Sequence, residues 1–429
     1  MAGIHFITQG CSSNLRESEI MMGILNNSGY EIINDEGNSS VNVVNICTVK
    51  GDTTAIREIR RIKKQNPGKK LIVSGCITES IAPKIKDIDE NISLVNTHNL
   101  GRISTVVENS LNGTVLELLD KKYEVKANLP SVRKNPVVGI APILNGCNYF
   151  CTFCSTKLVK GKLFSYPMDA IRQDVKGHLK AGCKEIWITS NDTGAYMVEQ
   201  GGEQRLVELL GQILSIPIDF KLRLGMMNPS NTITILDNLI NIYKHPKMFK
   251  FLHIPAQSGN NEILRLMNRR YTAEDFIKIV EIFRKEIPEI TISTDIIAGF
   301  PSETKEQFND SMDLLNKIKP DVLNLSRYAA REGTIAAKMK QLQTNSLKQR
   351  SRLMTSLYRQ IAFENNKKWL NWQGKILIDE KGKHDSWIGR NYCYKPVVVK
   401  GNFKLGDVAD VKITDFTSFD LRGECNLKI

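Results

Sequence analysis

The sequence predicts an α/β protein with three folded parts. We expect an N-terminal doubly wound α/β domain over residues 1–120, a central partial (βα)6 barrel over 135–335, and a C-terminal small all-β barrel over 366–429, preceded by a basic linking helix over 336–365. Apolar β-type runs alternate with helix-length amphipathic stretches through the first two parts, and short strands with glycine turns replace them after about Gln373. The length of 429 residues also exceeds the roughly 100 to 200 residues that one domain usually holds.

The composition indicates a globular protein with an anionic partner. Hydrophobic residues make up 41% of the chain and charged residues 24%, which is typical of soluble domains. No stretch approaches the roughly 18 apolar residues that span a bilayer, and the start lacks the features of a signal peptide, so we expect a cytoplasmic protein without a membrane partner. The net charge of +13 favours nucleic acid as partner over a merely solvated surface. The nine cysteines favour metal ligation over disulfides in a reducing compartment.

In the N-terminal domain, three apolar runs each lead into a cysteine. The runs HFIT, VNVVNI and LIVSG are followed by Cys11, Cys47 and Cys76, and a helix-like stretch comes after each. We expect Ser12 or Ser13 to begin the first helix, because serine is a preferred N-cap. Since chains leave parallel strands at one edge of a doubly wound sheet, the three cysteines are expected to gather there.

The central part begins after an irregular linker near residues 120–135. Six strand candidates follow, in the order VVGIAPIL, KEIWITS, FKLRLG, FKFLHIP, ITISTDII and DVLNLSRY. Helix-length stretches separate them, which predicts a βα repeat of six. Because the loops after the strands build the active site of a βα barrel, function is expected in those six loops.

The C-terminal part combines a basic helix with a small β-domain. Residues 338–368 carry eight lysines and arginines against the single acid Glu364, and three strand candidates follow after about Gln373. This pattern favours a nucleic-acid-binding appendage that leaves the central barrel complete without it. Its modest charge also fits a structural cap with an ordinary solvated face.

The clearest chemical signal is the run Gly146-Cys147-Asn148-Tyr149-Phe150-Cys151-Thr152-Phe153-Cys154, directly after the first strand of the central part. Its three thiols, at Cys147, Cys151 and Cys154, can hold three irons of a cubane 4Fe-4S cluster and leave the fourth iron open for a ligand. A structural zinc site is the main alternative. Such a site needs four ligands, and the neighbouring sequence offers no fourth cysteine or histidine.

This run resembles the radical S-adenosylmethionine (SAM) enzymes, which place an aromatic residue, here Phe153, before the last cysteine. The whole chain resembles the methylthiotransferase family, with a radical SAM barrel in the centre and a TRAM-like RNA-binding barrel at the end. The segments NGCNYFCTFCSTKLVKGKLFSYP and LRLGMMNPS are most similar to the branch that acts on N6-threonylcarbamoyladenosine beside the tRNA anticodon. Met197, where the family usually has glycine, and the run from Ala330 to Gly333, where arginine-proline-glycine is common, depart from the family pattern.

The resemblance implies two 4Fe-4S clusters, one on Cys147, Cys151 and Cys154 and one on Cys11, Cys47 and Cys76. Any one of the latter three could instead be an ordinary packing residue, as we expect for the cysteines outside both groups, Cys183, Cys393 and Cys425. It also implies two uses of SAM, one to methylate a sulfur and one to generate the radical, with no catalytic side-chain base. Residues expected to contact SAM, each of which could equally be a turn or cap residue, are Phe153, Asn191, Asp192, Gln257, Ser258 and Gly299.

The partners implied by the resemblance are tRNA, a sulfur donor and a small reducing protein of the ferredoxin or flavodoxin type as electron donor. Basic residues expected to contact phosphates, with a solvated helix face as the alternative for the second group, are Lys157, Lys160 and Lys162, then Arg57, Arg60, Arg61, Lys63 and Lys64. Alternative substrates are isopentenyladenosine in tRNA and an aspartate of a ribosomal protein. From a different class, a non-catalytic iron-sulfur RNA-binding protein would share the same cysteines.

Overall fold

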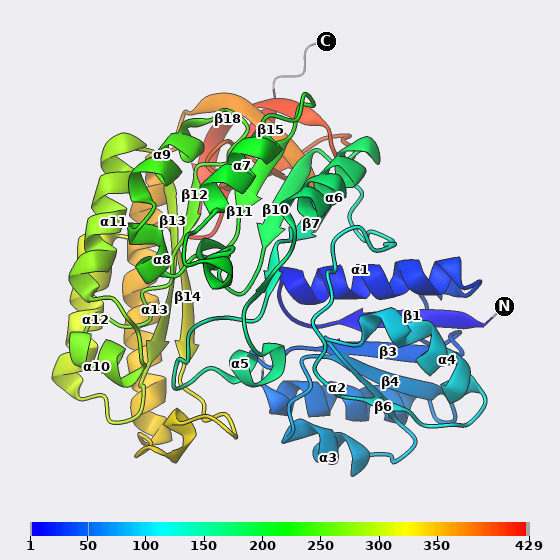
Figure 1. Cartoon of the computed structure of the whole chain (residues 1–429). Helices are drawn as coiled ribbons and strands as arrows, with labels where there is room; N and C mark the ends of the chain where they lie inside the picture. The colour runs from blue at the N-terminus through cyan, green and yellow to red at the C-terminus, as the bar shows by residue number, and fades with distance from the viewer. Residues whose placement is uncertain (1, 50, 426–429) are drawn as a thin grey trace.

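The computed structural model describes residues 2–49 and 51–425, so the last four residues of the predicted C-terminal barrel lie outside the described part. The N-terminal domain lies against the carboxyl ends of the central barrel strands, and the C-terminal barrel lies at the opposite end (Figure 1). The predicted fold class is confirmed, with all three parts present in the expected order. Within the described residues, no helix is both long and apolar enough to cross a bilayer.

The N-terminal domain is a six-stranded parallel sheet in the order β2-β1-β3-β4-β5-β6. Apolar clusters lie on both faces of the sheet, with α1 and α4 covering one face and α2 and α3 the other, so the domain is doubly wound. The sequence reasoning did not identify three of the strands, β2, β5 and β6. The elements are β1 (Gly3–Thr8), α1 (Ser12–Asn27), β2 (Glu31–Ile33), β3 (Val41–Ile46), α2 (Asp52–Gln65), β4 (Lys70–Gly75), α3 (Ile81–Lys86), β5 (Ser93–Asn96), α4 (Ile103–Leu111) and β6 (Glu117–Leu118).

The central part contains the six predicted strands, all parallel, with helices on their outer side. They form two three-stranded halves, β7-β10-β11 and β12-β13-β14, which meet where Leu222 bridges to Met248. The end strands β7 and β14 do not pair with each other in the described structure, so the barrel is partial. The strands are β7 (Val138–Pro142), β10 (Glu185–Thr189), β11 (Lys221–Leu224), β12 (Phe251–His253), β13 (Thr291–Ala298) and β14 (Val322–Arg327). The main covering helices are α6 (Met168–Lys180), α7 (Leu206–Leu214), α9 (Leu236–Lys244), α11 (Ala273–Glu286) and α12 (Lys305–Ile318).

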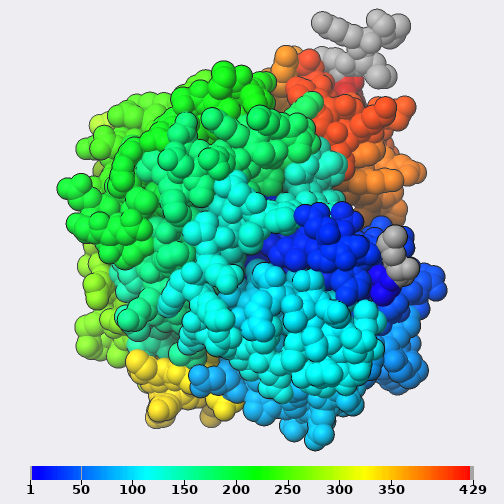
Figure 2. Space-filling model, turned by 45° about the vertical axis from the view of Figure 1, so that its right-hand side comes forward, coloured from blue at the N-terminus to red at the C-terminus, as the bar shows by residue number. Residues whose placement is uncertain are grey.

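Helix α1 joins the N-terminal domain to the barrel. The N-terminal segment lies in the surface between the rest of its domain and the barrel (Figure 2). Polar as well as apolar residues around the circumference of α1 are buried. Arg16 on α1 pairs with Asp174 on α6 at 2.8 Å, and both side chains are buried. Two further hydrogen bonds cross the junction, one between the Ser12 and Thr189 hydroxyls and one from the Thr48 hydroxyl to that of Ser155, each at 2.7 Å. The junction is therefore a packed, polar interface that fixes the two parts relative to each other.

The buried pair at this junction gives a testable prediction. Arg16→Met is expected to lower the free energy of unfolding by about 3 to 5 kcal/mol, because it leaves the Asp174 carboxylate buried without its partner. The control is Arg172→Met, whose exposed pair with Asp169 on the same helix α6 should contribute less than about 1 kcal/mol. Urea denaturation of both variants measures the difference, and equal small losses would show that the junction does not depend on this pair.

The C-terminal part begins later than the sequence pattern indicates. Helix α13 spans Thr344–Lys367, whereas the predicted helix starts at 336 or 338. Residues 336–338 form a separate short 3-10 turn, and the Gln341 side chain donates to the carbonyls of Ala336 and Met339, which holds the chain in a non-helical bend. After the helix, five strands close into a barrel in the order β15-β16-β17-β19-β18. They are β15 (Gln373–Lys381), β16 (Ser386–Arg390), β17 (Pro396–Lys400), β18 (Val408–Phe416) and β19 (Leu421–Cys425).

The terminal barrel packs against the central barrel. The expectation of an appendage that leaves the central barrel complete without it is therefore wrong. The buried ring of Tyr394 lies 4.8 Å from the ring of Phe249 and 5.1 Å from that of Phe251, centroid to centroid, at the amino end of β12. The next residue, Lys395, pairs with Asp321 before β14 at 2.7 Å. Without residues 366–429 these apolar rings and this carboxylate would be uncovered. The central barrel is therefore not complete without the tail.

Tyr394 should accordingly stabilise the whole molecule. Tyr394→Ala is expected to lower the free energy of unfolding by about 3 to 5 kcal/mol, since it removes a large buried ring from a close-packed contact. The control is Phe419→Ala in the same barrel, where the ring is 63% exposed and the loss should stay within about 0.5 kcal/mol. Denaturant titration measures both, and a loss for Tyr394→Ala as small as the control would restore the picture of an independent tail.

Candidate active site

The three closely spaced cysteines lie in the loop between the short strand β8 (Leu144–Asn145) and helix α5 (Ser155–Lys160). Gly146 opens this loop with φ of +76°, and a Cβ there would meet the carbonyl oxygen of Lys162 at 1.8 Å, so only glycine fits. Cys154 is the residue directly before α5, and its backbone N–H donates to the carbonyl of Cys151 at 3.1 Å. Thr152 in the loop also donates to the carbonyl of Met267 and accepts from the N–H of Ala336, at 3.1 and 2.9 Å, so the loop is fixed on the barrel and presents three thiols at the carboxyl end of the first barrel strand.

The second group of cysteines is placed by the N-terminal sheet. Strands β1, β3 and β4 are adjacent and parallel, so Cys11, Cys47 and Cys76 all follow the same edge, as the sequence predicts. Cys11 is the N-cap position of α1, and neither predicted serine caps the helix. Its thiol donates instead to Asn14 Oδ1 at 3.4 Å, which anchors Cys11 to the first turn of α1.

Both groups of cysteines line one cavity of about 510 Å³ between the N-terminal domain and the barrel. The sequence predicts two three-thiol sites in separate domains. Because the domains pack against each other, both sites line the same cavity. The thiols on its lining belong to Cys11, Cys47, Cys76, Cys147, Cys151 and Cys154. The remaining cysteines Cys183, Cys393 and Cys425 do not line it and lie in or against the cores of the barrels.

Burial disfavours the ionised form of these thiols. Burial raises the pKa of Cys147 and of Cys76 to about 12, and burial also raises the pKa of Cys11 and of Cys154. Metal binding requires the thiolate and releases the proton. Half-buried Arg269 donates from Nη1 to Cys151 Sγ at 3.3 Å, which stabilises negative charge on that sulfur.

No group of three or more His, Cys, Asp or Glu side chains among residues 2–49 and 51–425 is arranged to hold a single metal ion. Three thiols spaced along one loop, with no fourth cysteine in it, suit three corners of a cubane cluster.

Four of the six residues predicted to contact SAM line the cavity: Phe153, Asn191, Asp192 and Gln257. The carboxylate of buried Asp192 accepts from the backbone N–H groups of Gly194 and Asn228, at 3.1 and 2.9 Å, so part of its hydrogen-bonding capacity shapes the loop after β10. Gln257 has φ of +67°, a conformation that residues other than glycine rarely adopt. Such strain is commonly found where a side chain or carbonyl must face a ligand.

The other two, Ser258 and Gly299, do not line the cavity. The Ser258 hydroxyl is buried, where it accepts from the N–H of Asn260 at 3.2 Å and lies 3.4 Å from the Ser311 hydroxyl. The Gly299 N–H donates to Glu303 at 3.0 Å, and Gly299 faces α13 so closely that a Cβ would meet Leu347 at 2.0 Å. These contacts shape the loops in which Ser258 and Gly299 lie. Direct contact of either residue with SAM therefore stays a prediction that the geometry does not support.

The sequence reasoning missed the floor of the cavity, which is made by inward-facing side chains of the barrel strands. Trp187, Arg223, His253 and Asp295 line it. The Asp295 carboxylate accepts from Asn324 at 2.7 Å and lies 3.1 Å from His253 Nε2. The signal that could have found them is the alternation along β10, β11, β12 and β13, since every second residue of a barrel strand faces the interior.

The lysines after Cys154 are not the uniform phosphate-contacting group that the sequence suggests. Lys162 is exposed, and Lys157 lies over the exposed ring of Phe150 at 4.2 Å. Lys160, in contrast, is buried with 3% exposure, because it turns inward to a carboxylate on α1. Of the basic residues on α2, Arg61 forms ion pairs with Glu36 and Glu58.

The sequence matches three families along the chain: the Radical SAM superfamily over residues 141–315, the uncharacterized protein family UPF0004 over residues 3–97, and the TRAM domain over residues 375–425. A solved radical S-adenosylmethionine methyltransferase, TsrM from Kitasatospora setae, aligns with a TM-score of 0.55 and 12% identity, covering 79% of this chain and 74% of that one. At this identity the likeness shows the fold alone. Together, the fold and the cysteine loop define a radical SAM enzyme.

Curated relatives narrow the class. The probable threonylcarbamoyladenosine tRNA methylthiotransferase of Pyrococcus horikoshii is 40% identical to this chain, and the alignment covers 99% of each protein. The threonylcarbamoyladenosine tRNA methylthiotransferase of Drosophila melanogaster is 35% identical, over 97% of this chain and 76% of the fly protein. The chain belongs to this family and is a radical SAM methylthiotransferase.

Proposed function

We propose that this enzyme transfers a methylthio group to the adenine C2 of N6-threonylcarbamoyladenosine next to the tRNA anticodon, using two SAM molecules and two 4Fe-4S clusters. The observation that carries the proposal is the single cavity lined by both cysteine groups. A transfer reaction needs the activated adenine carbon and the incoming sulfur in one place, and proximity of this kind accounts for much of the rate of enzymatic reactions. The names of the relatives support the choice of nucleoside.

The residues present fit the two clusters. Cys147, Cys151 and Cys154 would hold one, and Cys11, Cys47 and Cys76 the other, each with one open iron. Such clusters supply the electron that cleaves SAM and a place for the sulfur to be transferred. Arg269 supports the thiolate of the first group through its contact with Cys151.

The chain's own side chains would orient ligands and exclude water. Phe153, Asn191, Asp192 and Gln257 lie on the cavity wall where SAM would extend from the barrel cluster. The adenine C2–H bond is too strong and non-acidic for a side-chain base, so a cofactor carries that step and no protein base is required. His253, the one histidine on the lining, is already engaged with Asp295.

The tRNA would approach the mouth of the cavity. Exposed Phe150, with Lys157 over its ring, offers stacking and positive charge together, a combination that suits unstacked nucleotides. Exposed basic residues Lys162, Arg57, Arg60 and Lys64 and the basic helix α13 would contact phosphates. The electron would come from a small reducing protein of the ferredoxin or flavodoxin type, and the sulfur from a separate donor.

Mass spectrometry of tRNA nucleosides tests the proposal. Anaerobic incubation with SAM, reductant and sulfide should convert N6-threonylcarbamoyladenosine to its 2-methylthio form in tRNA that carries it. Matched tRNA with unmodified adenosine or with isopentenyladenosine at the same position should stay unchanged. Conversion of isopentenyladenosine instead, or of a ribosomal-protein aspartate, would replace the proposed substrate with one of those alternatives. The non-catalytic alternative is excluded by membership in the enzyme family.

A further inference from the structure

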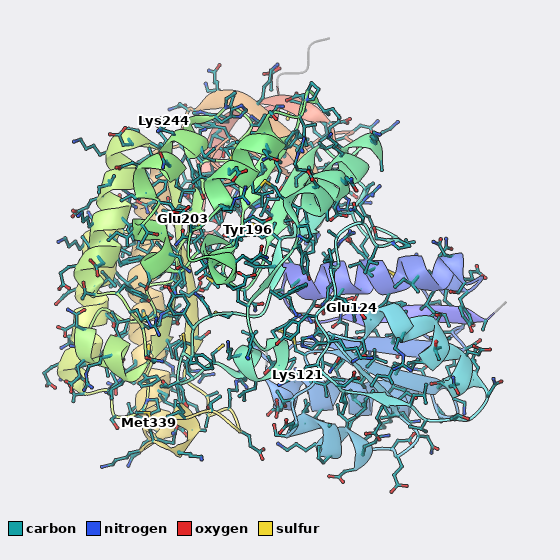
Figure 3. All side chains as sticks on the ribbon, in the orientation of Figure 1. Lys121, Glu124, Tyr196, Glu203, Lys244 and Met339 are labelled. Atoms are coloured by element: carbon teal, nitrogen blue, oxygen red, sulfur yellow. The ribbon has the colours of Figure 1, made fainter. Side chains whose placement is uncertain are left out.

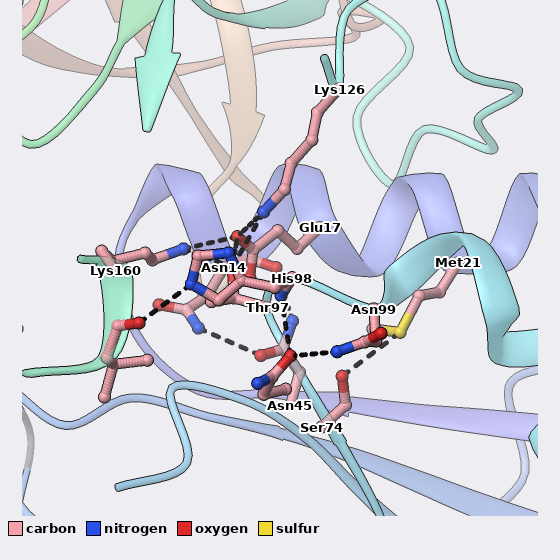
Figure 4. A network of polar contacts seen from close by, with 12 residues as sticks. Asn14, Glu17, Met21, Asn45, Ser74, Thr97, His98, Asn99, Lys126 and Lys160 are labelled. Carbon is pink, nitrogen blue, oxygen red and sulfur yellow. Dashed lines mark hydrogen bonds and ion pairs between the residues drawn. The ribbon is translucent and has the colours of Figure 1, made fainter. Parts of the chain in front are cut away.

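Three buried charges meet at the junction of the N-terminal domain and the barrel. The carboxylate of Glu17 on α1 accepts from Lys126 Nζ at 2.7 Å and from Lys160 Nζ at 2.6 Å (Figure 4). The Thr97 hydroxyl, after β5, donates to the same carboxylate oxygen and lies within 2.8 Å of both ammonium groups. We call Glu17, Lys126 and Lys160 the charge triad.

Each member of the charge triad comes from a different part of the chain. Lys160 ends helix α5 behind the cysteine loop, and Glu17 lies on α1 behind Cys11. Lys126 lies in the segment predicted as a linker, whose irregular backbone passes between the N-terminal domain and the barrel near Lys121 and Glu124 (Figure 3). The segment is therefore a structural part of the junction, although its sequence is typical of an exposed linker.

The charge triad has a net positive charge, because it contains two ammonium groups and one carboxylate. Side-chain exposures of Glu17, Lys126 and Lys160 are 3%, 9% and 4%, so water screens none of them. Among the described residues, Glu17 is the only carboxylate within 4.0 Å of either ammonium group. An uncompensated charge is costly in such a place unless another group of opposite sign lies near.

Titration of the triad reflects this excess. Burial alone would raise the pKa of Glu17, but the two ammonium groups lower it to about 2. Burial, with a contribution from the neighbouring Lys160, lowers the pKa of Lys126 to about 8, although Glu17 opposes the change. Lys160 keeps a raised pKa against burial because Glu17 and then the Cys76 thiol lie close by.

The residues that would hold a group of opposite sign share the cavity lining with Lys160. Lys160 lines the cavity together with Cys11, Cys47 and Cys76, whereas Lys126 does not. Three thiolates outnumber the two positive charges of an oxidised 4Fe-4S core, so a cluster bound at these cysteines is an anion. In this dry interior the attraction between it and an ammonium group is strong.

We propose that Lys160 is a positioning residue for the N-terminal cluster: the positive charge that Glu17 leaves unbalanced in the triad is balanced by the anionic cluster on Cys11, Cys47 and Cys76, and raises its reduction potential. This inference rests on the proposed second cluster. The same charge favours an anionic sulfur ligand on the open iron. This attraction also couples cluster binding to docking of the N-terminal domain on the barrel, because Lys160 belongs to the barrel and the three thiols belong to the N-terminal domain.

A redox titration followed by electron paramagnetic resonance tests the role of Lys160. The full chain with Cys147, Cys151 and Cys154 changed to alanine isolates the N-terminal cluster. In this background Lys160→Met leaves a balanced Glu17–Lys126 pair and should lower the reduced-to-oxidised ratio at fixed potential at least tenfold, a fall of about 59 mV for one electron. Lys126→Met is the matched control, because it removes the same charge on the side away from the cavity and should cause a smaller shift. Lys160→Arg should keep the parent potential.

The outcomes separate the inference from the proposed function. If the parent binds no cluster at Cys11, Cys47 and Cys76, the two-cluster function fails and the inference fails with it. If the cluster forms and its potential is the same in the parent and Lys160→Met, only the inference is overturned. Should Lys160→Met not fold, Glu17→Gln gives the opposite test, because it leaves both cations unbalanced and should raise the potential. An unchanged or lowered potential in that variant would also contradict the proposal.

Discussion

Replacing Cys147, Cys151 and Cys154 together by alanine is expected to abolish reductive cleavage of SAM by the anaerobically reconstituted enzyme. The three thiols are the only ligands that the barrel loop offers to a cluster with an open iron, and without that iron SAM has no anchor. The variant should also bind about half the iron of the parent, because the proposed second cubane would remain on the other three cysteines. Chromatography of 5′-deoxyadenosine after addition of dithionite measures the cleavage, and an iron assay measures the loss of the cluster.

Cys183→Ala is the matched control for this variant. Cys183 is buried in the core of the same barrel and does not line the cavity, so its loss should leave both iron content and SAM cleavage at the parent level. Full iron and continued SAM cleavage in the triple variant would refute the assignment of the radical site. Loss of both in Cys183→Ala would instead indicate that any cysteine change perturbs the fold.

Replacing Cys11, Cys47 and Cys76 by alanine should separate the two halves of the reaction. We expect SAM cleavage to persist near the parent rate and methylthio transfer to tRNA to disappear. The barrel loop keeps its own hydrogen bonds in this variant, while the proposed place of attachment for the sulfur, at the edge of the N-terminal sheet, would be lost. Nucleoside mass spectrometry measures the transfer, and 5′-deoxyadenosine again reports the cleavage.

Because both cysteine groups share a cavity, this second variant needs its own test of integrity. Cys425→Ala in the terminal barrel is the control, since Cys425 lies outside the cavity and should leave both activities intact. Circular dichroism and size-exclusion chromatography should show a folded chain for both. A folded triple variant that lost cleavage as well as transfer would contradict the division of labour between the two groups.

Much of the fold could be predicted because its signals are local. The six barrel strands and the three strands that lead to cysteines are apolar or alternating runs between helix-length stretches, and this order along the chain predicts parallel pairing. The missed strands β2, β5 and β6 have two to four residues each, too few to show a period. The late start of α13 was hidden because residues 336–343 share the helix's composition, and only the side chain of Gln341 reveals the bend.

The candidate site likewise has residues that local sequence predicts and residues whose role depends on distant segments. The spacing of Cys147, Cys151 and Cys154 is a property of one loop, and it indicates a cluster wherever the loop lies. Lys160 belongs to the same stretch of sequence as Lys157 and Lys162, yet it is buried because Glu17, 143 residues earlier, faces it across the junction. Nothing in the local pattern distinguishes a lysine that meets phosphate from one that meets a buried carboxylate.

The sequence by itself determined the class of the protein, its three parts and both groups of cysteines, because these follow from spacing and from the rule that parallel strands share one carboxyl edge. Only the tertiary structure decided that both groups line one cavity, that Lys160 turns inward, and that Tyr394 of the terminal barrel packs under the central one. These features depend on how whole domains pack, and the free energy of packing comes from shape and charge matched between segments far apart in the chain. Such matching leaves no period or spacing in any single stretch of sequence.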